Sequence, residues 1–588
     1  MSRKFVSRLV ISFLCLTVMI SSVSFAGETW DPTLRNPITT RSMMSGGVIA
    51  IAGDYPQSAI SAFKILEKGG TAFDAAVAMA ATMGIVNKQM NDIFGGDAMI
   101  MVYSAKEKQL FVYNATGWAP KAATIDHYMD IGGIPEKGIL SVHVPGAFSG
   151  WMTLLKDYGT LPLSEILAPA IHVAENGYPL DGSAASEAWM GMGMSTFNEE
   201  ARKVFAPNGV PVKRGELVYQ KDYAKLLTKV SKMGYQEAED YVYRGDLTKT
   251  IVDFAKSQGG ILTLEDFDDF KAEKVAPIST NYKGIDVFVC PPNCQGMVLL
   301  EALNILEGYD VKSLGHNTAE YMDLLTQALN LGLEDRNNFM GDPRFVDNPM
   351  GMITKEYAKV RREKDMQPGK AMPDKLVAGK PVEFNQFYRE KGGDTTFLAV
   401  ADAEGNIVAC TTSICDIWGS ATMVPGTGIM LNNRMSYYLL EEELPNHLEP
   451  RKRTVQTITP SIALKDGSPC FVFGTPGGDL QEQSKLQAFF NVFEFGMTPQ
   501  EAAEAPRFQS MHPRALLAAF KGAPPRTIGI EGRVPAAERE KMTQMGYNVV
   551  SRYDWEYKGL IGIIKIDPET GWKETGVDPR GENTAIAW

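Results

Sequence analysis

Two apolar segments on either side of a polar turn predict a β-hairpin in the last third of the chain. Residues 396–401 and 407–413 are rich in apolar and β-branched side chains, and residues 402–406 have the composition of a turn. A turn centred on Glu404 puts Thr395 directly opposite Ser413, on the same face of the hairpin. Opposed residues on antiparallel strands have Cβ atoms about 4.5 to 5.5 Å apart, so the pattern predicts two neighbouring hydroxyl groups.

Another short apolar segment, residues 471–473, leads through a glycine-rich turn into a helical pattern over residues 480–495. Gly477 and Gly478 lie in this turn. Because glycine has no side chain to shield its backbone, two successive glycines at a strand-to-helix turn expose N–H groups that can stabilise an oxyanion. An ordinary glycine turn is the alternative interpretation of these two residues taken alone.

The junction before the hairpin carries the candidate chemistry. Asp394 and Thr395 follow two glycines. A threonine hydroxyl is a poor nucleophile without a base beside it, and a chain cut before Thr395 supplies that base as the new α-amine, with an ordinary pKa of about 7.7 to 8.0. The opposed Ser413 hydroxyl would orient the Thr395 hydroxyl. The alternative is that Thr395 merely opens a strand.

These motifs and several others resemble the γ-glutamyltransferase family of N-terminal-nucleophile hydrolases. The shared segments cover nearly all of the chain after residue 26, and they are residues 69–82, 144–147, 158–163, 334–336, 341–343, 394–396, 402, 405–406, 428–433, 475–478, 505–508 and 578–580. The resemblance implies an α/β fold, a four-layer αββα sandwich forming one domain from two autoprocessed subunits, and no cofactor. It places the large subunit at residues 27–394 and the small subunit at residues 395–588, joined as a heterodimer.

The resemblance also assigns roles by position. Thr395 takes the place of the nucleophile, with self-cleavage between Asp394 and Thr395, and Gly477 and Gly478 take the place of the oxyanion hole. Ser413 occupies the position of a second-hydroxyl threonine. Serine keeps the hydroxyl and loses only a methyl group, so we expect its hydrogen bond to survive.

The substrate-binding positions depart from the family pattern. Where the family binds the substrate α-carboxylate with an arginine, this chain has Thr116. Where the family holds the α-ammonium with a glutamine or glutamate and then an aspartate, this chain has Arg434 and Tyr437. The other positions that the family uses for substrate binding carry Cys415, Gln456 and Thr457. Of these, only Thr457 keeps a hydroxyl.

Arg434 changes the expected substrate. A guanidinium about 4 Å from a substrate ammonium costs about 4 kcal/mol at an effective dielectric of 20, roughly a thousandfold in binding. The same guanidinium favours an acyl group that ends in a carboxylate with no neighbouring amine. The alternative is that Arg434 turns outward as a solvated charge.

The composition is that of an exported globular enzyme. Residues 1–26 combine basic residues, an apolar stretch and small residues at the end, the pattern of a cleavable signal peptide, which predicts a periplasmic or secreted protein without a membrane anchor. A membrane-retained N-terminus is the alternative.

The formal net charge of −12 opposes binding to nucleic acid or to anionic membranes. Cys290 and Cys294 have no common zinc spacing and the chain has six histidines, so we predict no metal site.

Three functions are compatible with this sequence. The first is a γ-glutamyltransferase-like enzyme with a threonine nucleophile, which cleaves a small-molecule amide or peptide through an acyl-enzyme and passes the acyl group to water or an amine. The second is an acylase for dicarboxylic amides, such as glutaryl amides, without γ-glutamyl activity. The third is a non-catalytic relative that binds a ligand. A non-catalytic relative has no need of Thr395, Ser413 and the glycine pair, so the sequence favours an enzyme.

Self-cleavage is directly testable. The mature protein should split into fragments 27–394 and 395–588, whereas Thr395→Ala should remain one chain because it lacks the attacking hydroxyl. Intact-mass measurement of the two purified proteins checks this expectation. A wild-type protein that is active yet uncleaved would contradict it.

Overall fold

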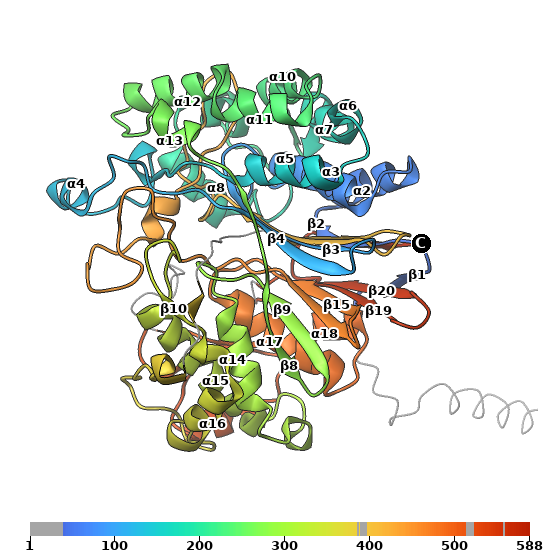
Figure 1. The fold of residues 1–588 in the computed structure, drawn as a ribbon, viewed down its shortest axis with the longest axis vertical. Helices are drawn as coiled ribbons and strands as arrows, with labels where there is room; N and C mark the ends of the chain where they lie inside the picture. The colour runs from blue at the N-terminus through green and yellow to red at the C-terminus, as the bar shows by residue number, and fades with distance from the viewer. Residues whose placement is uncertain (1–38, 385–386, 389–396, 513–522, 557–558) are drawn as a thin grey trace, which may run out of the picture. The chain divides into compact units, whose positions relative to one another are not determined.

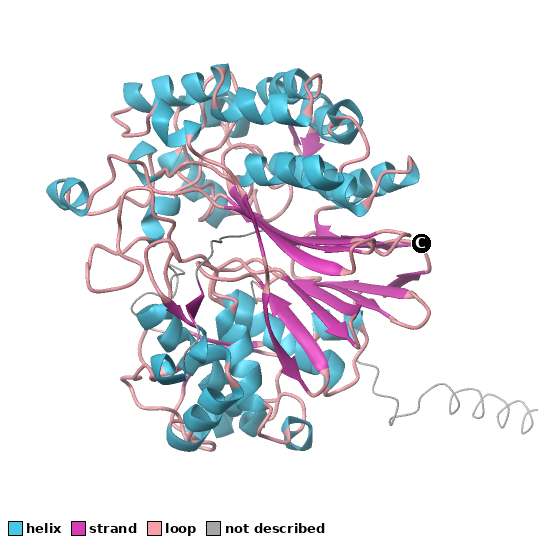
Figure 2. Ribbon diagram, in the orientation of Figure 1, coloured by secondary structure: helices cyan, strands magenta, loops and turns pink. Residues whose placement is uncertain are grey.

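Two seven-stranded antiparallel sheets lie face to face at the centre of the fold (Figures 1 and 2). The computed structural model describes residues 39–384, 387–388, 397–512, 523–556 and 559–588, and Arg41–Trp588 form one unit. The first sheet, sheet I, has the order β21-β2-β12-β13-β3-β4-β7, and the second, sheet II, has the order β1-β20-β19-β15-β14-β9-β8. The strands of sheet I are β2 (Ala50–Asp54), β3 (Asp97–Ser104), β4 (Gln109–Ala115), β7 (Glu273–Val275), β12 (Phe397–Ala401), β13 (Ile407–Ser413) and β21 (Asn583–Ala587). Those of sheet II are β1 (Met44–Gly46), β8 (Ile278–Tyr282), β9 (Ile285–Val289), β14 (Ser461–Lys465), β15 (Ser468–Gly474), β19 (Gly562–Ile566) and β20 (Lys573–Val577).

Helices cover the outer face of each sheet, which gives the four layers of the expected αββα sandwich. On sheet I these helices include α2 (Pro56–Glu67), α3 (Ala72–Val86), α5 (Ala147–Tyr158), α7 (Ala168–Asn176), α10 (Lys221–Val230), α11 (Tyr235–Tyr243) and α12 (Asp246–Ser257). On sheet II they are α14 (Met297–Leu306), α15 (Ala319–Phe339), α16 (Lys355–Lys364), α17 (Leu480–Phe493), α18 (Pro499–Glu504) and α19 (Ala536–Gln544). The predicted α/β fold class is confirmed.

Shorter elements connect these layers. The other helices on the side of sheet I are α4 (Ile125–Asp130), α6 (Leu163–Ile166), α8 (Glu187–Thr196), α9 (Glu199–Phe205) and α13 (Leu264–Asp268). The small sheets pair β5 (Tyr178–Pro179) with β6 (Leu217–Val218), β10 (Asn348–Pro349) with β11 (Phe387–Tyr388), and β16 (Phe508–Ser510) with β17 (Thr527–Glu531) and β18 (Asn548–Arg552).

The core has one apolar layer on each side of sheet I and another outside sheet II. Met99, Phe397 and Ile458 belong to the layer between the two sheets, whereas Cys410 packs on the outer face of sheet I with the helices. Because both faces of β3, β12 and β13 are covered, every residue of these strands is buried and their sequences read as nearly continuous apolar runs.

The predicted hairpin forms with the predicted register over its described part. β12 pairs with β13 from Phe397 opposite Thr411 to Ala401 opposite Ile407, which centres the turn on Glu404. The segment predicted as a strand at residues 471–473 lies in β15, and the helix predicted at residues 480–495 is α17. Thr395 lies outside the described residues, so its pairing with Ser413 stays a prediction.

Asp402 holds the turn of this hairpin against the helical layer of sheet I. Its Oδ1 accepts the backbone N–H groups of Glu404 and Asn406 at 3.0 and 2.9 Å. Its Oδ2 accepts the backbone N–H of Ala72, the first residue of α3, at 2.9 Å. A carboxylate at a helix N-terminus also interacts favourably with the helix dipole. One buried side chain therefore joins the hairpin to a helix from the other end of the sequence.

Asp402→Asn should lower the free energy of unfolding by about 1 to 3 kcal/mol. The substitution removes the negative charge, and it replaces one acceptor oxygen with an NH2 group that would face a backbone N–H donor. Asp466→Asn is the matched control, since Asp466 is an exposed aspartate in the β14–β15 turn. Thermal unfolding of both variants and of the wild type measures the difference. Equal midpoints for the two variants would count against this role of Asp402.

Candidate active site

Ser413, Asp97 and Thr116 lie side by side where three neighbouring strands of sheet I end or begin. Ser413 ends β13 and pairs with Asp97, which begins β3. Ala98 pairs with Ala115, so Thr116 follows β4 beside Asp97. All three side chains are buried. We call these three residues the strand-end row, and the predicted hairpin register places Thr395 next in it, beyond Ser413.

The Ser413 hydroxyl shapes the turn that follows β13. Its oxygen accepts the backbone N–H of Cys415 at 2.8 Å, and Cys415 adopts a φ of 83° in this turn. The half-buried Cys415 thiol lies 3.9 Å from the Ser436 hydroxyl. Asp394 and Thr395 lie outside the described residues, so the cleavage site and the two-hydroxyl pair remain predictions.

Arg434 is fully buried at the start of the short 3-10 helix η6 (Arg434–Tyr437). Its Nε lies 3.5 Å from Asp97 Oδ2, and its guanidinium carbon lies 5.0 Å from the centre of the Tyr437 ring. An arginine over an aromatic face gains a cation–π interaction. The alternative in which Arg434 turns outward as a solvated charge is therefore wrong, and Arg434 and Tyr437 lie together beside the strand-end row.

Asp97 was not predicted, although it connects several parts of the site. Besides the Arg434 ion pair, its carboxylate accepts the backbone N–H of Gly117 at 3.0 Å and contacts His143 Nε2 at 2.8 Å. An ionised carboxylate can only accept hydrogen bonds, so this His143 nitrogen donates to it. The sequence held a signal for this residue: a Gly-Gly-Asp triplet occurs at residues 95–97, 392–394 and 477–479.

Thr116 is held by local contacts. Its hydroxyl donates to Asn114 Oδ1 at 3.1 Å, and its carbonyl accepts a hydrogen bond from Arg453 Nε at 2.8 Å. Arg453 is fully buried, its Nη1 pairs with Glu273 at 3.2 Å, and burial lowers the pKa of Arg453. A buried guanidinium thus lies against the position where the family resemblance led us to expect an arginine.

The glycine turn lies between β15 and α17, as predicted. Gly477 and Gly478 have φ angles of 121° and 59°, in the left-handed region that favours glycine. Their carbonyls accept the first backbone N–H groups of α17, from Leu480 and Gln481, at 3.0 and 3.1 Å. With both carbonyls engaged in the helix, the turn can present its own N–H groups to a reacting oxygen.

Gln456 and Thr457 are fully buried in the segment that enters β14. Neither polar atom of the Gln456 side chain has a hydrogen-bond partner among the described residues. The Thr457 carbonyl accepts a hydrogen bond from Gln295 Nε2 at 3.0 Å, and the same nitrogen donates to the Gly478 carbonyl at 3.2 Å. The structure therefore joins Thr457 to the glycine turn through Gln295, which the sequence did not predict.

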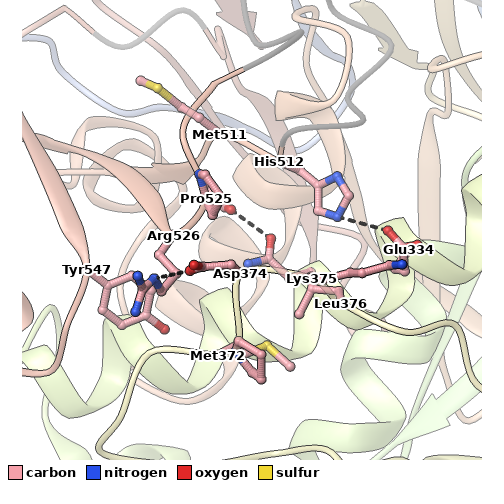
Figure 3. Close-up of a pocket in the computed structure, with 13 residues that line it drawn as sticks. Glu334, Met372, Asp374, Lys375, Leu376, Met511, His512, Pro525, Arg526 and Tyr547 are labelled. Atoms are coloured by element: carbon pink, nitrogen blue, oxygen red, sulfur yellow. Dashed lines mark hydrogen bonds and ion pairs between the residues drawn. The ribbon is translucent and has the colours of Figure 1, made fainter.

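A separate cavity of about 170 Å³ lies beside α15 (Figure 3). Two pairs of its lining residues are in contact: His512 Nε2 lies 3.4 Å from a carboxylate oxygen of Glu334, and Arg526 forms an ion pair with Asp374 at 2.8 Å. None of the predicted site residues lines this cavity. We therefore do not assign it to the predicted acyl pocket.

Two fully buried cysteines, Cys290 and Cys410, are poor candidates for a competing nucleophile. Burial raises the pKa of the Cys290 and Cys410 thiols well above the usual range, and the thiolate is the reactive form.

Among the described residues, no three His, Cys, Asp or Glu side chains are grouped so as to hold a metal ion. Within the same residues, every helix is too short or too polar to cross a membrane.

Comparison with known proteins identifies the family. Residues 58–588 match the family model described as Gamma-glutamyltranspeptidase. The chain is 34% identical over 527 residues to the glutathione hydrolase-like YwrD proenzyme of Bacillus subtilis (strain 168), covering 89% of this chain and 95% of that protein. It is 32% identical over 477 residues to the acylase ACY 1 proenzyme of Pseudomonas sp. (strain SE83), covering 79% and 82% respectively.

Solved structures give the same answer. The cephalosporin acylase from Bacillus halodurans superimposes with a TM-score of 0.84 at 31% sequence identity, covering 95% of this chain and 99% of that one. Fold and relatives together define an amide hydrolase or transferase of the N-terminal-nucleophile class. The chain belongs to the γ-glutamyltranspeptidase family.

Gly478→Val should lower turnover by about 10²-fold or more, because valine disfavours the positive φ of Gly478 and would shift its N–H away from the reacting oxygen. Loss of one oxyanion donor costs about 2.7 to 4 kcal/mol. A β-branched residue at positive φ also strains the backbone. Gly496→Val is the matched control, since Gly496 has a φ of 71° and open space around its Cβ position. Steady-state kinetics and thermal unfolding of both variants separate the two effects. Normal turnover in well-folded Gly478→Val would show that this turn is not the oxyanion hole.

Proposed function

We propose that this chain is a self-processing amidase whose nucleophile is Thr395, released as a new N-terminus by cleavage after Asp394. Membership of the γ-glutamyltranspeptidase family and the word proenzyme in the names of the relatives support this proposal. The hairpin register supports it too, because Ser413 ends the strand opposite the predicted nucleophile. The pattern of residues 1–26 supports a periplasmic or secreted location.

The proposed reaction has two steps. In the first, the Thr395 α-amine takes the proton of its own hydroxyl as that oxygen attacks the amide carbon, and the backbone N–H groups of Gly477 and Gly478 stabilise the oxyanion. The α-amine then gives the proton to the departing nitrogen, which leaves an acyl ester on Thr395. In the second step, water or an amine attacks the ester and releases the acyl group.

The buried position of Arg434 beside Asp97 carries the proposal for the acyl group. The Asp97 carboxylate already has three partners, namely Gly117, His143 and Arg434, and is therefore a poor partner for a substrate ammonium. The Arg434 guanidinium has five N–H donors in all and suits a carboxylate. We propose that the preferred acyl group ends in a carboxylate without an adjacent amine, as in a glutaryl amide.

The Asp97 charge reduces the size of the expected effect. An ammonium about 4 Å from Arg434 is repelled by about 4 kcal/mol at an effective dielectric of 20. Attraction to the Asp97 carboxylate, about 7 Å away, offsets about 2 kcal/mol of this repulsion. The remaining penalty of about 2 kcal/mol corresponds to roughly thirtyfold in binding. The names of two relatives, cephalosporin acylase and acylase ACY 1, support an acylase function.

A γ-glutamyl substrate is the second candidate. Arg453 favours it, because its guanidinium lies against Thr116, where the family resemblance led us to expect the arginine that binds the α-carboxylate. The relative named glutathione hydrolase-like YwrD proenzyme also supports it. The two candidates differ in one measurable quantity, the ratio of kcat/KM for a glutaryl amide to kcat/KM for the matching γ-glutamyl amide.

The wild-type enzyme should hydrolyse a glutaryl amide with a kcat/KM at least about tenfold higher than that for the γ-glutamyl amide with the same leaving group. Arg434→Gln should remove most of this preference, because the cationic partner of the terminal carboxylate is lost. Glutamine is preferable to glutamate here, since a glutamate would bury a second carboxylate beside Asp97.

A butyryl amide is the internal control, because it has nearly the same length and no charge. Arg434→Gln should leave its kcat/KM near the wild-type value, which separates a charge effect from a general loss of folding. If the wild-type enzyme turns over the γ-glutamyl amide faster, the acylase proposal is wrong and the γ-glutamyl candidate is favoured. If it turns over no amide and stays uncleaved, the enzyme proposal itself fails.

A further inference from the structure

Arg336 and Gln295 form a buried pair behind the glycine turn. Arg336 is the last residue of the Glu334-Asp335-Arg336 segment noted in the sequence, and it lies near the end of α15. Its Nη1 donates to Gln295 Oε1 at 2.6 Å and also contacts Asp479, the residue that follows the glycine pair. Arg336 and Gln295 are at most 1% exposed.

This contact fixes the orientation of the Gln295 amide. Arginine has only donors, so the amide oxygen of Gln295 must face Arg336. The amide nitrogen is thereby turned the other way, toward the Gly478 and Thr457 carbonyls at 3.2 and 3.0 Å. The same Gln295 side chain therefore holds one backbone carbonyl of the glycine turn and one of the predicted acyl-binding segment.

The Gln295 backbone strengthens the connection. Its N–H donates to the Gln456 carbonyl at 2.9 Å, and the Gln456 N–H donates to the Asn293 carbonyl at 2.9 Å. Two glycines at positive φ have wide conformational freedom, so a turn built from them needs outside contacts to keep one geometry. The Gly478 carbonyl belongs to the peptide unit that follows Gly478, so anchoring it fixes the end of the turn. That in turn limits the rotation of the two preceding peptide units, whose N–H groups would face an oxyanion.

We propose that Gln295, oriented by Arg336, is a positioning residue that sets the geometry of the Gly477–Gly478 turn and of Thr457 together. This inference rests on the proposed function, because it takes the glycine turn as the oxyanion hole. It adds a dependence of turnover on two residues that lie outside the set of predicted site residues.

The test is the near-isosteric change Gln295→Glu. An ionised glutamate can still accept from Arg336, but it cannot donate to the Gly478 and Thr457 carbonyls and repels them. We expect kcat to fall by about 10²-fold, the size of effect found when one oxyanion donor is lost. Hydrogen exchange followed by mass spectrometry should show faster exchange in the peptide covering residues 474–486.

Gln487→Glu is the matched control. Gln487 is also a buried glutamine whose Nε2 donates to two backbone carbonyls, those of Gln483 and Phe508, but it does not contact the glycine turn. It should leave kcat close to the wild-type value. A second pair of variants guards against misfolding: Arg336→Lys keeps a cationic donor and should retain more turnover than Arg336→Met.

The outcomes separate the inference from the proposed function. Wild-type kcat and wild-type exchange in Gln295→Glu would overturn the inference and leave the amidase proposal intact. Faster exchange with unchanged kcat would overturn both the inference and the assignment of the turn as oxyanion hole. Equal losses of kcat in Gln295→Glu and Gln487→Glu would also overturn the inference, since any buried charge would then have the same effect.

Discussion

The hydrogen-bonded register between β13 and β3 determines which side chains meet at the candidate site. It pairs Ser413 with Asp97, and Asp97 in turn binds Arg434. A shift of one residue would turn every side chain of β13 to the opposite face and place Cys410 between the sheets. Such a shift is strongly disfavoured because both faces of sheet I are packed: small and apolar residues face the helices on one side and sheet II on the other.

The parts of this site that depend on local sequence could be predicted. The hairpin and its register follow from a two-residue period and a turn at Glu404, and the glycine turn before α17 follows from two adjacent glycines. The roles proposed for Thr395 and the glycine pair could be argued from the chemistry of these residues, and the family resemblance then assigned the same roles by position. Thr395 itself lies outside the described residues, so its pairing with Ser413 stays a prediction that rests on the register of the described part of the hairpin.

The residues that sequence reasoning missed are brought in by contacts between distant segments. Asp97 meets Arg434 only because three strands and a 3-10 helix converge, and no local pattern of charge encodes that meeting. The same convergence explains why Arg434 is buried. Removing a guanidinium from water is costly unless a carboxylate and further hydrogen-bond acceptors surround it, and the sequence alone does not reveal whether they do. Gln295, unlike Asp97, gave no signal at all, because a lone glutamine belongs to no motif.

The order of strands in the two sheets has a consequence for the life of the mature protein. Sheet I takes β2, β3, β4 and β7 from before Thr395 and β12, β13 and β21 from after it, and sheet II is mixed in the same way. After a cut before Thr395, neither fragment would own a complete sheet or a complete core. Separating the fragments and unfolding them would then be one event, so dilution would not dissociate them as it does ordinary subunits. The precursor folds as a single chain, but the two fragments of a cleaved molecule cannot be rejoined after they unfold. Unfolding would therefore be irreversible, and the working lifetime of the protein would be set by its rate of unfolding.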